Sequence, residues 1–251
     1  MTALAASLAL LVGLTLGLLG GGGSILTVPV IAFTLGVDPK TAIVMSLPIV
    51  GGASLIGVAR HWKLGNIDFR VAIPFGAAAM VGAFGGARLA RFMEGGTQLI
   101  LLAVVMLGAS VSMFRNANLA EPETPSTPRQ IGPLTFVVGA LTGTLTGLVG
   151  VGGGFLLVPA LVLLAKVPMR QAVGTSLFVI VLNTVAGFAG YAGSVTVPWM
   201  LVLYFAGFTA VGILLGSGLA AKVSQANLKR AFAALLVLVA AYILWQSRST
   251  F

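Results

Sequence analysis

Residues 17–29 read GLLGGGGSILTVP, and residues 147–159 read GLVGVGGGFLLVP. Eight of the thirteen positions are identical when the two stretches are aligned at an offset of 130 residues. Each stretch places a run of glycines inside a long apolar segment, where a helix would otherwise continue. Glycine is unfavourable in helices and permits the left-handed backbone that a turn needs. We therefore predict that both segments break, at residues 20–23 and at residues 150–154.

The same offset relates the remainder of the two halves. Matches in this register are Val37/Val167, Lys40/Arg170, Ala42/Ala172, Ser46/Ser176, Leu47/Leu177, Gly57/Gly187, Gly82/Gly212, Gly86/Gly216 and Leu89/Leu219. We predict two repeated modules, residues 1–115 and 132–251. Residues 116–131 contain three prolines among polar residues and are typical of an extended linker.

Composition places the chain in a membrane. Of its 251 residues 58% are hydrophobic and 8% are charged, with a mean hydropathy of +1.10, whereas soluble domains carry about 25% charged residues. Apolar runs such as 99–113, 136–149 and 231–245 approach the roughly 20 residues that span a bilayer. The alternation of a barrel strand is absent. The fold class predicted is an all-α polytopic membrane protein.

Each half contains one broken segment and three ordinary spans. The spans are expected at 41–58, 69–90 and 97–114, and again at 171–190, 198–220 and 228–245. A continuous helix over residues 2–35 would be about 51 Å long, well beyond a hydrocarbon core of about 30 Å. We expect each break to be followed by a short helix of about 12 residues, at 24–35 and at 155–166, in a re-entrant or broken pair.

The basic residues favour an odd number of crossings per half. Lysine and arginine accumulate on the cytoplasmic side of membrane proteins. With three net crossings per half, ten of the 14 basic residues share one side, and with an even number they divide 8 against 6. We therefore predict inverted repeats, a cytoplasmic linker, and both termini in the periplasm of a bacterial inner membrane. The first 19 residues have no basic n-region, so we read them as a retained helix rather than a signal peptide.

Several functions are disfavoured by residue content. Basic residues lie in short clusters at span ends rather than in one patch, so nucleic acid is not an expected partner. Cysteine is absent, and no Asp or Glu falls inside a predicted span. We therefore predict no catalytic residues, no metal site, no cofactor and no carboxylate proton relay. His61 lies in an Arg-His-Trp-Lys cluster at a span end, which is typical of an interface anchor, with proton coupling as the alternative.

The breaks point to an anion site. Irregular backbone at membrane depth persists where it is buried in protein or lines a cavity, and its free amide groups attract anions. Ser24 could cap its short helix or bind a ligand. The predicted substrate-binding residues are Gly20, Gly21, Gly22, Gly23, Ser24, Gly150, Gly152, Gly153, Gly154, Phe155, Ser46, Ser176 and Asn183. The alternatives are close helix packing for the glycines, back-bonding to the helix for the serines, and an interhelical hydrogen bond for Asn183.

The duplicated G-x-x-G-x-G-G-G/S-x-x-x-V-P element and the A-x-x-x-S-L that follows it resemble the TauE/SafE family of sulfite exporters and related permeases. The resemblance extends from about residue 11 to residue 245. It implies transport of sulfite, sulfoacetate or a similar sulfonate, mostly outward, across the inner membrane. An anion channel or a permease for an unrelated small anion is the alternative, and a homodimer is left open.

Overall fold

The computed structural model describes residues 3–115, 132–164, 167–220 and 222–247, and this part of the chain is helical with no strand. Six of its helices are long and apolar enough to cross a membrane. They are α3 (Pro39–Lys63), α4 (Phe69–Ala90), α5 (Gly95–Arg115), α8 (Met169–Gly190), α9 (Trp199–Ala220) and α10 (Gln225–Ser247). The all-α membrane fold and the six ordinary spans are confirmed. The predicted linker lies outside the described residues.

Both apolar segments break at their glycines. In the first, α1 (Ala3–Leu19) leads into a 3₁₀ turn η1 (Gly20–Gly23), then α2 (Ser24–Pro29) and a π-helical turn η2 (Val30–Thr34). In the second, α6 (Pro133–Val149) leads through a turn into α7 (Gly154–Pro159) and a second π-helical turn, η3 (Ala160–Leu164).

The short helices follow each break as predicted, and the first runs over Ser24–Thr34, but each is made of an α-helical part and a π-helical part. α2 and α7 each contain six residues, and each ends at a proline that is followed by a π-helical turn. Proline cannot donate to the carbonyl four residues earlier, and its ring crowds that carbonyl. A π turn widens the helix at this point. Pro29 and Pro159 therefore set where each short helix changes its geometry.

The helix boundaries recur at the offset seen in the sequence. α1, α2, η2 and α4 shifted by 130 residues coincide with α6, α7, η3 and α9. The halves also exchange their first helices, because α1 packs on α9 and α6 packs on α4. An internal repeat would produce this arrangement, and the repeat itself stays our inference.

Glycines at a spacing of four form the contacts between these exchanged helices. The pairs are Gly13/Gly17 on α1, Gly212/Gly216 on α9, Gly82/Gly86 on α4 and Gly143/Gly147 on α6. A β-carbon at any of these eight glycines would overlap a backbone carbonyl of the partner helix. Small residues at this spacing let membrane helices approach closely. The sequence reading noticed some of these glycines only as repeat matches.

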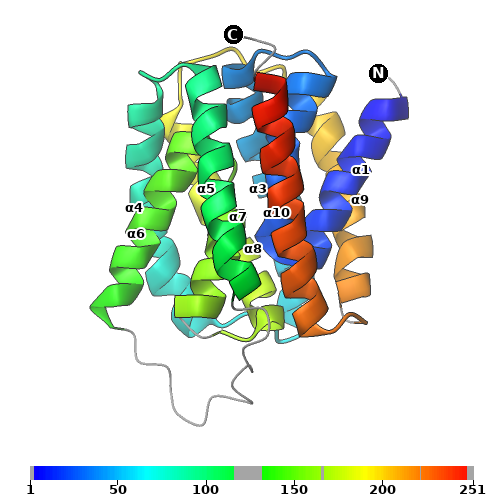
Figure 1. Cartoon of the computed structure of the whole chain (residues 1–251), viewed down its shortest axis with the longest axis vertical. Helices are drawn as coiled ribbons and strands as arrows, with labels where there is room; N and C mark the ends of the chain where they lie inside the picture. Colours follow the sequence, from blue (N-terminus) through cyan, green and yellow to red (C-terminus); the bar gives the residue numbers. More distant parts are fainter. Residues whose placement is uncertain (1–2, 116–131, 165–166, 221, 248–251) are drawn as a thin grey trace.

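The bundle has two ends, which we name by the loops that lie there. At the α4–α5 end, Lys40 Nζ at the start of α3 donates to the carbonyls of Arg91 (2.8 Å) and Met93 (3.1 Å). At the α3–α4 end, the amide of Asp68 donates to Thr175 Oγ1 near the start of α8 (3.0 Å). α1 begins and α10 ends at the α4–α5 end, whereas α5 ends and α6 begins at the opposite end (Figure 1).

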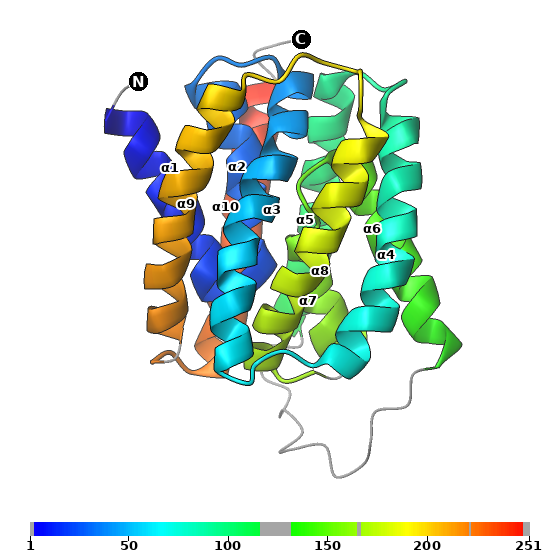
Figure 2. The same cartoon turned by 180° about the vertical axis from the view of Figure 1, so that it is seen from behind.

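The broken segments occupy the middle of the bundle. α5 and α10 pack together on one side, and α3 and α8 pack together on the other (Figures 1 and 2). α2 contacts α3 and α10, α7 contacts α5 and α8, and the two short helices contact each other. The glycine breaks are therefore enclosed by protein, which satisfies the requirement for irregular backbone in a membrane protein.

Candidate functional site

The two glycine breaks meet through their backbones. A β-carbon built on Gly21 would overlap the backbone of Gly154, and one built on Gly154 would overlap Gly21. No other residue type could keep the two chains this close. The site therefore contains main-chain groups from both halves of the sequence, brought together from positions far apart in the chain.

The second break uses left-handed backbone. Gly150, Gly152 and Gly153 have φ values of 71°, 69° and 75°. Gly150 ends α6, and its amide donates to the carbonyl of Thr146 at 2.7 Å. Side chains other than glycine are strained in this region, so the sequence of the break is required by its conformation.

The first break is a tighter 3₁₀ turn. Gly20 has a φ of 67°, and the turn continues directly into α2. Ser24 does not cap this helix, which was one of the two roles considered for it. Its hydroxyl donates backward to the carbonyl of Gly21 at 2.6 Å, and the cap position is held by Gly23 without a side-chain bond. The chain reaches Ser24 already in helical geometry, so no free amide faces its hydroxyl.

Ser46 and Ser176 adjoin the two breaks from α3 and α8. Ser46 Oγ lies 2.6 Å from the carbonyl oxygen of Gly150 and 2.8 Å from that of Ile43 in its own helix. Ser176 Oγ donates to Val173 at 2.8 Å and lies 3.0 Å from the position of a β-carbon on Gly20. Both hydroxyls thus back-bond to their helices, and Ser46 also holds the second break.

Asn183 is one of several buried side chains with polar atoms that lack a hydrogen-bond partner in the described part of the chain. It is fully buried on α8, and neither its amide nitrogen nor its amide oxygen has a partner among the described residues. Its helix neighbours Ile180 and Thr184 both lie against Gly152. Asn183 lies within one helical turn of both residues, with two donors and an acceptor to offer.

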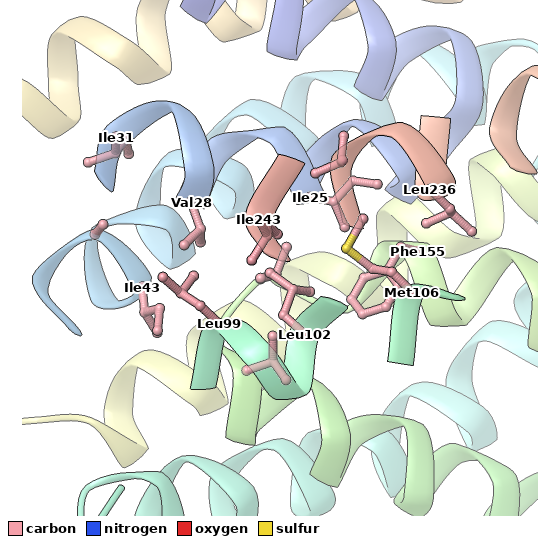
Figure 3. Close-up of a cluster of buried hydrophobic side chains, with 14 of the residues drawn as sticks. Ile25, Val28, Ile31, Ile43, Leu99, Leu102, Met106, Phe155, Leu236 and Ile243 are labelled. Carbon is pink, nitrogen blue, oxygen red and sulfur yellow. The ribbon is translucent and has the colours of Figure 1, made fainter. Parts of the chain in front are cut away.

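Phe155, a member of the predicted set, is fully buried. It belongs to a buried apolar cluster with Ile25, Met106 and Leu236, drawn from α2, α5 and α10 (Figure 3). Its ring therefore contributes to the packing of the short helices.

Charged groups lie away from this region. The described carboxylates, Asp38, Asp68 and Glu94, fall in segments between helices. No group of three or more His, Cys, Asp or Glu residues that could hold a metal occurs in the described part of the chain. What the site offers chemically is hydrogen bonding from main-chain groups, hydroxyls and one amide.

Comparison with known proteins places this geometry in a family. The family model described as sulfite exporter TauE/SafE matches residues 5–243. The chain belongs to the TauE/SafE family. This confirms the resemblance drawn from the glycine element, and the chain is a multi-pass membrane transporter rather than an enzyme.

The TauE/SafE chain is also similar to proteins named as transporters in distant organisms. A "probable membrane transporter protein" of Xylella fastidiosa is 34% identical over 244 residues, covering 94% of this chain and 92% of that protein. A protein of the same description from Methanocaldococcus jannaschii is 28% identical, and the match covers 87% of this chain and 86% of that protein. The protein YunE of Bacillus subtilis is 26% identical, covering 95% and 96%. No solved structure matches.

A polar network in the TauE/SafE transporter escaped sequence reasoning. Gln98 Nε2 donates to the carbonyl of Leu148 at 2.7 Å and to the hydroxyl of Tyr191 at 2.9 Å. Tyr191 in turn donates to the carbonyl of Gly147 at 3.0 Å. Burial raises the pKa of the Tyr191 phenol, although the bond from Gln98 lowers it, so the group stays a neutral donor. The network satisfies carbonyls at the end of α6, directly before the second break.

Thr146 and Thr184 also lie at the second break without having been predicted there. A β-carbon on Gly153 would overlap Thr146 Oγ1, and one on Gly152 would lie 3.1 Å from Thr184 Cγ2. Thr184 had been noted only as a polar residue within a span. The sequence does contain a signal for both threonines. Thr146 precedes Gly150 by about one helical turn, and Thr184 directly follows Asn183.

Proposed function

We propose that this TauE/SafE transporter moves a small sulfur-containing anion, such as sulfite, sulfoacetate or a similar sulfonate, outward across the bacterial inner membrane. The observation that carries the proposal is the meeting of two glycine breaks, with the buried, unpartnered amide of Asn183 within one helical turn of residues that lie against Gly152. Buried polar groups in proteins are nearly always hydrogen-bonded. A bound oxyanion would supply acceptors for the amide hydrogens and for nearby main-chain N–H groups.

The short helices limit what their dipoles contribute. α2 and α7 keep α-helical geometry for six residues before each π turn. The proposed site therefore depends on close backbone approach at glycines and on the Asn183 amide, more than on a long helix dipole. Such neutral donors suit an anion that must bind and leave again during transport.

The driving force proposed is the membrane potential. The described carboxylates lie between helices, which leaves no acidic relay for protons within the described spans. An inside-negative potential alone favours outward movement of an anion by about 2.3 kcal/mol per charge per 100 mV. The inner-membrane location, the cytoplasmic α3–α4 end and the periplasmic termini form part of this proposal and are supported by the bias of basic residues.

The experiment is sulfite flux through the purified protein in proteoliposomes. We expect saturable flux that responds to an imposed potential and shows counterflow, as a carrier does. Gly152→Leu should abolish it, because Gly152 has a φ of 69° and its β-carbon would lie 3.1 Å from Thr184 Cγ2 and 3.2 Å from Val50 Cγ1. Gly52→Leu is the control, since its β-carbon would meet nothing within 4 Å.

Two results would count against the proposal. Sulfite and sulfonate flux equal to that of empty vesicles would remove the substrate assignment. Flux that ignores both voltage and Gly152→Leu would remove the site. Flux without saturation or counterflow would instead indicate a channel.

A further inference from the structure

The end of α3 carries two adjacent side chains, a half-buried arginine and a buried histidine, with buried nitrogen atoms that lack a partner. His61 is 4% exposed, and neither Nδ1 nor Nε2 has a hydrogen-bond partner among the described residues. Arg60 Nε next to it is likewise buried and unpartnered. Leaving such groups unpaired costs free energy, so they indicate a place where a ligand completes the hydrogen bonding.

Three spans enclose this pair. A β-carbon placed on Gly174 of α8 would lie 3.1 Å from His61 Cβ, and one on Gly218 of α9 would lie 3.3 Å from Arg60 Nη2. α3 packs against both of these helices. The two glycines therefore leave room for the basic side chains in a corner between α3, α8 and α9.

Asp68 is the acidic residue of the α3–α4 loop, at the same end of the bundle. Its Oδ1 accepts the amides of Arg70 (3.2 Å) and Val71 (3.4 Å) at the start of α4. The guanidinium of Arg60 stays charged and, like the protonated ring nitrogen of a histidine, donates hydrogen bonds. Two such donors side by side favour an oxyanion as ligand.

His61 also lies in line with the glycine breaks. Ser46, Val50, Ser54, Gly57 and His61 are spaced by four, four, three and four residues and so share one face of α3. At one end of this face Ser46 contacts Gly150, and midway along it Ser54 Oγ is buried without a partner. His61 is 15 residues from Ser46, which corresponds to about 22 Å along the helix.

The α4–α5 end of the bundle differs in the hydrogen bonding of its buried polar side chains. Its buried polar side chains, Gln98 and Tyr191, bond to each other and to the carbonyls at the end of α6. The Gln98 amide nitrogen and the Tyr191 hydroxyl are therefore already bonded within the protein, unlike the ring nitrogens of His61 at the α3–α4 end.

We propose that Arg60 and His61 form a second anion site, at the α3–α4 end of α3, where a small oxyanion is taken up before it reaches the glycine breaks. Its role in uptake rests on the proposed transport function. The same donors could accept the phosphate of a lipid headgroup, which is also an oxyanion. The near-complete burial of His61 favours the small anion.

The test measures sulfite flux from each face of proteoliposomes made of phosphatidylcholine, with and without phosphatidylglycerol, using protein of known orientation. For Arg60→Gln and for His61→Leu we expect KM to rise about tenfold or more for sulfite presented at the α3–α4 end, since one charge-assisted hydrogen bond is lost. KM at the other face and kcat should change less than about twofold. Arg60→Lys, which keeps the positive charge, should retain most of the wild-type affinity for sulfite. Lys63→Gln is the matched control, because it removes a charge from an exposed side chain three residues away.

The outcomes separate this site from the transport proposal. Unchanged KM at both faces in Arg60→Gln and His61→Leu would overturn the second site while leaving sulfite transport standing. An effect that appears only with phosphatidylglycerol would assign the pair to a lipid headgroup and overturn it too. If the wild-type protein carries no sulfur anion, calorimetric titration of sulfite still decides: weaker binding by Arg60→Gln than by Lys63→Gln supports the site, and equal binding contradicts it.

Discussion

Asn183 shows, at the scale of one residue, a conflict between stability and function. A buried amide with no partner destabilises the fold, whereas a buried amide that bonds to the protein stabilises it. Proteins keep such unfavourable groups where a ligand requires them. Whether Asn183 has a partner within the protein therefore decides whether an apolar substitution there raises or lowers the stability of the fold.

Asn183→Leu should leave the thermal unfolding midpoint in detergent unchanged or raise it, because an apolar side chain of similar size replaces an unsatisfied amide. The same substitution should abolish anion flux. Gln98→Leu is the comparison, since the Gln98 amide donates to Leu148 and Tyr191. Loss of these hydrogen bonds should lower the free energy of unfolding by about 1–3 kcal/mol. A midpoint that falls as far in Asn183→Leu as in Gln98→Leu would show that Asn183 is bonded within the protein.

At the scale of elements, the glycine pairs between α4 and α6 and between α1 and α9 set how closely the halves approach. Gly85 and Gly86 of α4 allow a test within two consecutive residues. A β-carbon on Gly86 would overlap the carbonyl of Thr144, whereas one on Gly85 would meet nothing within 4 Å.

Gly86→Leu should therefore destabilise the protein by about 1–3 kcal/mol or more through overpacking, and Gly85→Leu should have little effect. The measurement is the fraction of monodisperse protein in detergent and its thermal unfolding midpoint. Equal behaviour of the two variants would mean that α4 and α6 are not in close contact in the membrane.

Elements were more predictable than their contacts. The predicted span 69–90 coincides with α4, because Asp68 caps the start and charged residues follow the end. Both glycine breaks were predictable because four or more residues of low helix preference stand in one place. The exchange of α1 and α6 between the halves was not predictable. Hydrophobic periodicity shows which face of a helix is apolar, but it does not show which distant helix covers that face. Likewise nothing around Gln98 or Tyr191 in the sequence indicates that they meet.

At the scale of the whole molecule, the arrangement of ends follows from the two breaks. Each broken segment turns back before crossing, so each half makes three net crossings and the second half starts from the opposite end (Figure 1). If the breaks were absent, the halves would begin at the same end. Basic residues then could not concentrate on one side, and the halves could not exchange their first helices as antiparallel partners.

Single cysteines test this arrangement cleanly, because the chain has no cysteine of its own. Phe92→Cys lies at the α4–α5 end, where Phe92 is 91% exposed, and Leu64→Cys lies at the α3–α4 end, where Leu64 is 55% exposed. In intact cells an impermeant maleimide should label Phe92→Cys and leave Leu64→Cys unlabelled until the membrane is opened, because the proposed orientation puts the basic end in the cytoplasm. Lys222→Cys, in the exposed segment between α9 and α10, should follow Leu64→Cys, since α9 ends where α3 ends (Figure 2). The reverse labelling pattern would mean that the protein has the opposite orientation with the same fold. If Leu64→Cys and Lys222→Cys were labelled from different sides, one half would make an even number of crossings. The meeting of the two breaks would then have no basis.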